Sequence, residues 1–256
     1  MILAVPILIA VSLFLGWLLV ALAINALPLF SGVSAGLLVL ARSGSIAEGL
    51  IAGALVGIAA ATIGPVAFSR ARSPMLRLLI VLAFANTHLH AARQWTPHLA
   101  RRWGLIILIC SFGVETLGAA TGFPFGTYRY THNFGPLLGL VPATIPLAWY
   151  VVVTNSLFIV RRAMPHTSRW IEAGAAAFLC TLYDFILEPF ATTVKRYWLW
   201  DHGAIPVQNY AAWFILSGLL VEFFAPTAST RFPRDLRPIA ILCLTLLIFL
   251  IGKWAH

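Results

Sequence analysis

The sequence contains few charged residues and very few acidic ones. Only 10% of the 256 residues are charged, and Asp and Glu together number 8. About a quarter of the residues in a soluble domain are charged, so the composition excludes an ordinary soluble protein. Hydrophobic residues make up 61% of the chain. The sequence therefore predicts an all-α fold, a polytopic membrane helix bundle that forms one integral membrane domain over residues 1–256.

Cysteine pairs and histidine motifs are also lacking. Cys110, Cys180 and Cys243 are isolated in apolar runs, where a buried thiol is the ordinary interpretation. The seven histidines form no HExxH motif and no repeated histidine box, which disfavours a metal-dependent membrane hydrolase. The first apolar run has neither a basic start nor a small-residue cleavage site, so we expect a first span rather than a removable signal peptide.

Basic residues give a net charge of +9, but they occur in short clusters between apolar runs. This distribution is typical of a topology signal rather than of nucleic-acid binding. The clusters within 93–102, 161–169 and 231–237 are separated by pairs of expected spans. All three are therefore predicted on the cytoplasmic side, with loops 121–138 and 189–207 together on the other side.

Seven apolar runs are long enough to cross the membrane, which takes about 20 residues. They lie at about 3–27, 47–67, 104–120, 139–160, 171–188, 208–225 and 238–254. Residues 31–41 are predicted as a re-entrant piece or the start of a broken helix. Residues 75–92 contain several polar side chains, and a span there would place Arg77 opposite the other basic clusters. We therefore expect 75–92 to be non-spanning or tilted, within a total of seven or eight transmembrane helices.

Three acidic residues fall inside apolar runs near the end that faces those two loops: Glu115, Asp184 and Glu188. Carboxyl groups within a membrane are costly and usually functional. Asp184 and Glu188 are four residues apart and share a helix face, and Pro189 ends or bends the helix beside them. Glu115 and Asp184 lie at one depth, about 6–8 Å inside the helix ends at 1.5 Å per residue. We expect the three side chains to converge.

A purely structural role is the alternative for each single carboxylate, which would then pair with an Arg or a Tyr hydroxyl and hold helices together. Three cations lie within reach along the sequence: Arg129, Lys195 and Arg196. Glu172 and Glu222 differ from the three, because they lie near basic loops and are expected to pair with Arg169 or Arg231.

The two loops are rich in aromatic residues and in Gly and Pro. Tyr and Trp are common at membrane interfaces, but Gly and Pro also fix loop backbones in defined turns. The pattern predicts a rigid aromatic lid over the buried acids.

The ordered set of motifs over about 113–214 resembles the CruF-type carotenoid 1,2-hydratases, membrane proteins of carotenoid biosynthesis. The resemblance rests on Glu115, Gly122-x-Pro124-Phe125-Gly126-x-Tyr128-x-Tyr130, Gly135-Pro136, Gly139-x-x-Pro142-x-x-x-Pro146-x-x-Trp149, Asp184-x-x-x-Glu188-Pro189, Trp198-x-Trp200 and Gly203-x-x-Pro206-x-x-Asn209-Tyr210-x-x-Trp213. The first hundred residues offer no matching motif, and the segment between Trp200 and Pro206 is shorter than in the family's pattern.

The resemblance implies addition of water, without a cofactor or metal, across the terminal C=C bond of an acyclic carotenoid, giving a tertiary alcohol. Lycopene or a related C40–C50 carotenoid would be the substrate, membrane lipid the surroundings, and the prokaryotic cell membrane the location. No nucleic acid is involved.

The residues suit this chemistry, which needs an acid, a stabilised tertiary cation and a base. Two carboxyl groups close together in low dielectric can share a proton, and a second carboxylate can take a proton from water. We expect Asp184 to be the donor and Glu188 or Glu115 the base. Aromatic faces stabilise a cation by roughly 0.5–2 kcal/mol each. The predicted substrate-binding residues are Tyr128, Tyr130, Trp149, Tyr183, Trp198, Trp200 and Asn209.

Two further alternatives remain open at the level of sequence. A proton-coupled transporter would also use buried carboxylates, although these gather at one side rather than along a path. The other is a non-catalytic carotenoid-binding membrane protein.

Overall fold

A computed structural model describes residues 35, 38–55, 73–227 and 235–254. The chain divides into two compact units, residues 1–70 and 71–254. The first unit contains the helix Ile46–Leu55. The predicted run at 3–27, much of 47–67 and most of 31–41 lie outside the described residues. The prediction of one domain over the whole chain stays a prediction.

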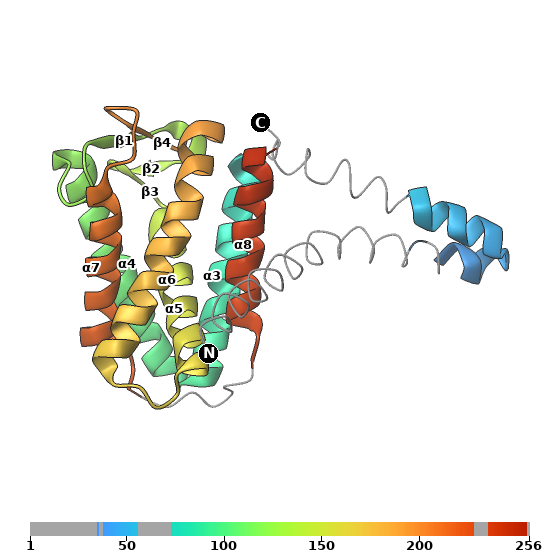
Figure 1. Cartoon of the computed structure of the whole chain (residues 1–256), viewed down its shortest axis with the longest axis horizontal. Helices are drawn as coiled ribbons and strands as arrows, with labels where there is room; N and C mark the ends of the chain where they lie inside the picture. The colour runs from blue at the N-terminus through green and yellow to red at the C-terminus, as the bar shows by residue number, and fades with distance from the viewer. Residues whose placement is uncertain (1–34, 36–37, 56–72, 228–234, 255–256) are drawn as a thin grey trace, which may run out of the picture. The chain divides into compact units, whose positions relative to one another are not determined.

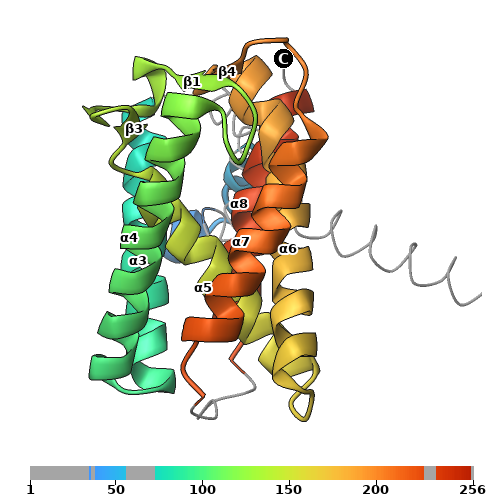
Figure 2. The same ribbon diagram turned by 90° about the vertical axis from the view of Figure 1, so that its left-hand side faces the viewer.

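The described part of the second unit is a bundle of long helices, in which consecutive helices run in opposite directions (Figures 1 and 2). The helices are α3 (Ser73–Gln94), α4 (Pro97–Thr121), α5 (Ile145–Ala163), α6 (Arg169–Pro189), α7 (Val207–Phe224) and α8 (Arg237–Trp254). Five of them correspond to the runs predicted at 104–120, 139–160, 171–188, 208–225 and 238–254.

Helix α5 is the centre of the bundle. It packs against α3, α4, α6, α7 and α8, and every residue from Trp149 to Phe158 is buried. A helix that is apolar around its whole circumference is stable only when other helices cover it on all sides. The position of α5 therefore follows from its composition.

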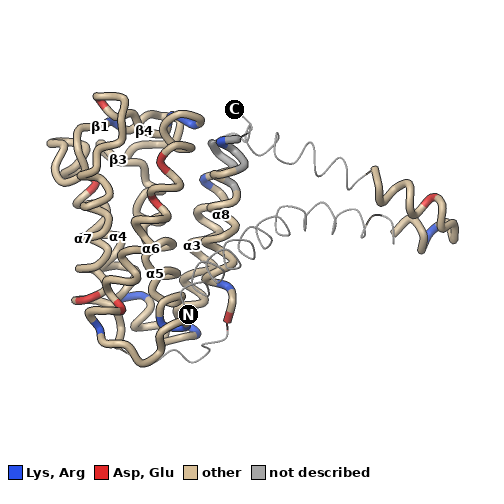
Figure 3. Tube along the Cα trace, viewed as in Figure 1, with Lys and Arg blue, Asp and Glu red and all other residues tan. Residues whose placement is uncertain are grey.

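One end of the bundle carries the basic clusters that are described, at the end of α3 and α5 and the start of α4, α6 and α8 (Figure 3). The opposite end carries the short strands. The predicted grouping of loops 121–138 and 189–207 is confirmed, because strands from the two loops pair with each other. Arg231 and Arg234 lie outside the described residues.

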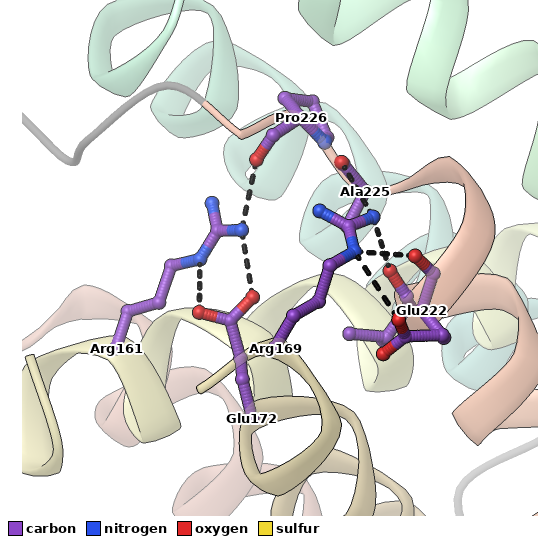
Figure 4. A network of polar contacts seen from close by, with 7 residues as sticks. Arg161, Arg169, Glu172, Glu222, Ala225 and Pro226 are labelled. Carbon is purple, nitrogen blue, oxygen red and sulfur yellow. Dashed lines mark hydrogen bonds and ion pairs between the residues drawn. The ribbon is translucent and has the colours of Figure 1, made fainter. Parts of the chain in front are cut away.

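At the basic end, two arginines join α5, α6 and α7 (Figure 4). Arg161 Nη2 donates to Oε1 of Glu172 at 2.8 Å and to the carbonyl oxygen of Pro226 at 2.8 Å. Arg169 donates to carbonyl oxygens at the end of α7 and lies 3.8 Å from a carboxylate oxygen of Glu222. Glu222 thus lies beside Arg169, one of the two predicted partners, whereas Glu172 pairs with Arg161 at the end of α5 instead.

The expectation of a non-spanning or tilted segment at 75–92 stays a prediction, and α3 is not among the described helices that are long and apolar enough to cross a membrane. It is one continuous helix of 22 residues that packs along α4 and α5. Two of its polar residues face α5: Asn155 Nδ2 donates to Thr87 Oγ1 at 2.9 Å, and His88 Nδ1 lies 3.2 Å from the Tyr150 hydroxyl. Thr87 and His88 are thus partners of the central helix, whereas Asn86 and Arg93 are exposed.

The lid consists of residues 122–144 and 195–206 and covers the end opposite the basic clusters. It contains β1 (Tyr128–Tyr130), the 3-10 helix η1 (His132–Phe134), β2 (Leu137–Leu138), β3 (Val141–Pro142) and β4 (Trp198–Trp200). β1 pairs antiparallel with β4, and β2 with β3. Gly126, at φ +111°, allows the two parts of the lid to approach each other closely, because a Cβ there would lie 2.7 Å from Pro206 Cγ.

Pro189 ends the α-helical part of α6, as predicted. The chain then continues as a five-residue π-helical segment, η2 (Phe190–Val194). A proline lacks the N–H that would continue the hydrogen-bond ladder, and a wider turn accommodates this loss beside Glu188.

Among the described residues, three helices are long and apolar enough to cross a membrane: Pro97–Thr121, Arg169–Val194 and Val207–Phe224. Large apolar side chains point outward from them, including Ile109, Phe178 and Ile215, each more than half exposed. Lipid is the solvent that such surfaces need. The count of seven or eight spans stays a prediction.

Candidate active site

Beneath the lid lies a cavity of about 120 Å³ that collects residues from all six helices and from the strands. Its wall contains Glu115, Asp184 and Glu188, and also each of the seven residues predicted to bind substrate: Tyr128, Tyr130, Trp149, Tyr183, Trp198, Trp200 and Asn209. The structure thus brings all ten predicted site residues together. Their catalytic and binding roles stay predictions.

Glu115 is held by three neutral donors. The hydroxyl groups of Tyr128 and Tyr130 both donate to its Oε2 at 2.7 Å, and Trp149 Nε1 donates to Oε1 at 2.8 Å. An indole N–H can only donate, so the oxygen facing Trp149 accepts. Short bonds from three donors favour the ionised carboxylate.

Gly118 allows Tyr128 to reach Glu115. A Cβ at position 118 would lie 2.7 Å from the Phe125 ring and 3.0 Å from the Tyr128 hydroxyl. Gly118 is three residues after Glu115 and therefore on nearly the same face of α4. A larger residue would push the tyrosine away from the carboxylate.

The pairing of β1 with β4 positions four aromatic rings. Tyr128 lies opposite Trp200, and Tyr130 lies opposite Trp198. Side chains two residues apart in a strand share a face, so all four rings turn toward the cavity, whereas Arg129 between the tyrosines is exposed. The two tyrosine hydroxyls donate to Glu115, and the two indole N–H groups donate to Glu188.

Glu188 also accepts from three donors, but over longer distances. Trp200 Nε1 lies 3.1 Å and Trp198 Nε1 3.2 Å from Oε2, and Asn209 Nδ2 lies 3.4 Å from Oε1. The carboxylate is therefore oriented without being held as tightly as Glu115, which leaves it more capacity to accept a proton.

Asp184 has a single hydrogen bond among the described residues, from Asn209 Nδ2 to Oδ2 at 2.7 Å. The same amide nitrogen reaches Glu188, so Asn209 links the two carboxyl groups across one helix turn. Asp184 is 2% exposed. A buried carboxyl group with one neutral donor has the least support for a negative charge, so Asp184 is the member of the trio that suits a proton.

Uncharged groups supply the hydrogen bonds found to these three carboxyl groups within the described residues. These donors are hydroxyl, indole and amide groups. The tyrosine hydroxyls on Glu115 are partners that the structural alternative also predicts, so that alternative stays open for Glu115. Neutral donors orient a carboxylate and leave its charge uncompensated, so the charge is available to a cationic species in the cavity.

Several cavity residues were not predicted. Trp213 stacks on Trp149 with ring centroids 3.8 Å apart and 6° between the planes, although its place in the motif, four residues after Asn209, was a usable signal. α3 adds Leu76, Leu79, Ile80 and Ala83, and α8 adds Thr245 and Phe249. The α3 residues follow the i, i+3, i+4, i+7 spacing of one helix face, which indicates burial but not what lies opposite.

The two lid tyrosines stay neutral at ordinary pH. Burial first, and then the negative charge of Glu115, raise the pKa of Tyr128 and Tyr130 above their usual value of 10. Both phenols therefore remain donors to Glu115 across the physiological range. Because the unfolded chain releases these protons first, the folded state loses stability as the pH rises above about 10.

A titration of tyrosinate absorbance checks this environment. We expect the double variant Tyr128→Phe, Tyr130→Phe to show the same absorbance rise as the wild type between pH of about 7 and 11, because neither phenol ionises there in the folded protein. Circular dichroism controls for unfolding. A rise in the wild type larger by one or two tyrosines would contradict the buried, charge-facing placement.

In the described part of the chain, no group of three or more His, Cys, Asp or Glu side chains is arranged to hold a metal ion. His88 lies on α3 beside Tyr150, and His90 Nδ1 lies 3.4 Å from Asp235 near the basic end. Neither histidine belongs to the cavity wall.

The fold and the site define a membrane helix bundle with an acidic, aromatic cavity beneath a lid. The chain belongs to the family of carotenoid biosynthesis proteins, whose model matches residues 75–255. The match begins at α3, upstream of the motifs recognisable in the sequence. This membership and the apolar helices identify a membrane protein.

A curated protein that is similar to this chain is the bisanhydrobacterioruberin hydratase of Haloarcula japonica. The two are 32% identical over 140 residues, which are 50% of this chain and 46% of that protein. The chain spans about half the length of the curated relative it matches. No solved structure matches the chain.

Proposed function

We propose that this protein adds water across the terminal C=C bond of an acyclic carotenoid such as lycopene. Family membership supports a carotenoid substrate, and the similar hydratase supports hydration. The observation that carries the proposal is the convergence of three buried carboxyl groups on one largely apolar, aromatic cavity. Acid and base groups in an apolar pocket are what hydration of an isolated alkene requires.

The reaction begins with a proton from Asp184. The proton adds to the less substituted carbon of the terminal double bond, whose π electrons form the new C–H bond, and the other carbon becomes a tertiary cation. Asp184 is left as a carboxylate bonded to Asn209. General acid catalysis by a positioned group contributes about 10²- to 10⁴-fold to a rate.

Glu115 and the aromatic rings stabilise the cation. Three donors favour the ionised form of Glu115, and opposite charges attract strongly where water is excluded. The stacked Trp149 and Trp213 pair lies beside Glu115. An aromatic face near a cation adds about 0.5–2 kcal/mol.

Glu188 takes the proton of the incoming water. The water oxygen bonds to the tertiary carbon, one water proton passes to Glu188, and the product is a tertiary alcohol. The proton then returns from Glu188 to Asp184, one helix turn away and linked by Asn209. The cycle consumes one alkene and one water and returns every protein group to its starting state, so the proposal requires no cofactor.

Product analysis tests this function directly. The full chain would be expressed in bacterial cells that make lycopene. The carotenoids would be separated by chromatography, and their molecular masses would be measured by mass spectrometry. We expect one or two products heavier than lycopene by one or two water molecules, each with an unchanged polyene absorption spectrum, because a terminal bond lies outside the conjugated system. Pigment bound to the purified protein without any hydrated product would indicate a carotenoid-binding protein instead and would overturn the proposal.

A further inference from the structure

The cavity wall is closed around the acids and open on one side. Glu115, Asp184 and Glu188 are each at most 5% exposed. The cavity residues on α3 and α8 are accessible by comparison, because Leu79, Ile80, Ala83, Thr245 and Phe249 are only half-buried. Accessibility therefore increases from the carboxyl groups toward these two helices.

The arrangement of the helices explains this opening. α3 packs on α4 and α5, and α8 packs on α5 and α6, so α3 and α8 flank the central helix with at most marginal contact between their described residues (Figure 2). Ala148 and Val152 of α5 also line the cavity. These residues are one helix turn apart and small, which leaves space above the central helix.

The opening is lateral. Its α3 residues lie in the second and third turns after Ser73, and Thr245 and Phe249 lie in the last three turns of α8. The lid covers the adjoining end of the bundle, where Trp198, Trp200 and Tyr128 are buried. The accessible side of the cavity thus faces the surroundings of the helices rather than the water beyond the lid.

The volume of the cavity requires an exit for a long substrate. A cavity of about 150 Å³ holds benzene, a molecule of six carbons. The 120 Å³ found here accordingly matches one branched end group of a carotenoid, of about five carbons. The remainder of the polyene must lie outside the cavity, and it needs an apolar path of small cross-section.

We propose that the polyene lies in a lateral groove between α3 and α8, formed by Leu79, Ile80, Ala83, Thr245 and Phe249 and called the α3–α8 groove. The inference rests on the proposed function and assigns the residues that admit a long, flat, unsaturated chain from the lipid. The end group passes inward to Asp184, and the remaining chain extends into the membrane.

Phe249 sets one wall of the α3–α8 groove. Its ring contacts Tyr183 at a centroid distance of 5.8 Å in an edge-to-face manner and Phe190 at 5.3 Å. The rings are held by each other, so the width of the groove is fixed on this side. Ala83, on the opposite wall, is the small residue whose enlargement narrows the groove most directly.

Pigment retention by an inactive enzyme tests the groove apart from turnover. Asp184→Asn would be purified from lycopene-producing cells, and the visible absorbance of bound carotenoid would be divided by the amount of protein. Ala83→Phe and Thr245→Phe would each be added to this background. Each should lower the ratio of bound carotenoid to protein at least about fivefold, because the larger side chain fills the groove and leaves less room for the polyene. The matched controls Ala85→Phe and Leu244→Phe, on outward faces of the same helices, should stay within about twofold.

The outcomes separate the groove from the chemistry. Retention unchanged in both groove variants, or an Asp184→Asn protein that binds no carotenoid, would overturn the groove. If a melting assay shows that Ala83→Phe does not fold, the retention ratio of Thr245→Phe, on the opposite wall of the groove, decides the question. Absence of hydrated product from the wild type would refute the proposed function, while the retention ratios still decide whether the polyene lies between α3 and α8.

Discussion

Asp184→Asn is expected to abolish hydration while the protein still inserts and binds carotenoid. The amide has the size of the carboxyl group and cannot deliver a proton, so the first step of the reaction is lost. We expect the rate to fall about 10²- to 10⁴-fold. The yield of hydrated carotenoid per amount of membrane protein, measured by chromatography and mass analysis, checks this.

Asp201→Asn is the matched control for this variant. Asp201 is exposed in the turn after β4 and outside the cavity wall, so the same chemical change there should leave the yield as in the wild type. A wild-type yield from Asp184→Asn would remove Asp184 from the role of proton donor. Equal losses in both variants would point to a general effect on the lid.

Glu115→Gln is expected to reduce hydration about 10²- to 10³-fold, as removal of one electrostatic contact to a transition state does. The amide removes the negative charge that faces the tertiary cation. It also points N–H groups at donors: either Trp149 Nε1 or the two tyrosine hydroxyls would then face an NH₂ group. Single-turnover rates with bound lycopene, compared with the pigment ratio, separate the chemical step from binding.

Glu48→Gln provides the control for that change, because Glu48 is exposed on the helix Ile46–Leu55. Its yield should equal that of the wild type. If Glu115→Gln lost bound pigment and activity in equal proportion, Glu115 would be a binding residue, and the stabilisation of the cation would need another source.

The acidic site was predictable because burying a charge is costly. A carboxyl group inside an apolar run is usually functional, and Glu115, Asp184 and Glu188 all lie near the C-terminal ends of their helices, at the same end of the bundle. Helix periodicity places Asp184 and Glu188 on one face without any knowledge of the fold. The lid aromatics were predictable from their sequence spacing, Tyr128-x-Tyr130 and Trp198-x-Trp200, which the paired strands explain.

The rest depended on long-range packing that local patterns do not encode. The sequence of α3 contains polar residues, and only its partners on α5 show that Thr87 and His88 are inside the bundle. The stacking of Trp213 on Trp149 joins two helices far apart in the chain. The roles within the acid trio also required structure, because they follow from how many donors each carboxyl group meets.

The β1–β4 pair has a consequence for how members of this family can differ in length. A one-residue insertion within Tyr128–Tyr130 or Trp198–Trp200 would reverse the faces of the residues beyond it, withdrawing a hydroxyl from Glu115 or an indole from Glu188. The turn at 201–206 begins only after the paired residues, so it can shorten or lengthen without moving any of the four rings. A difference in length at this turn, such as the one expected from the sequence between this chain and the family's pattern, would therefore leave the geometry around the acids intact.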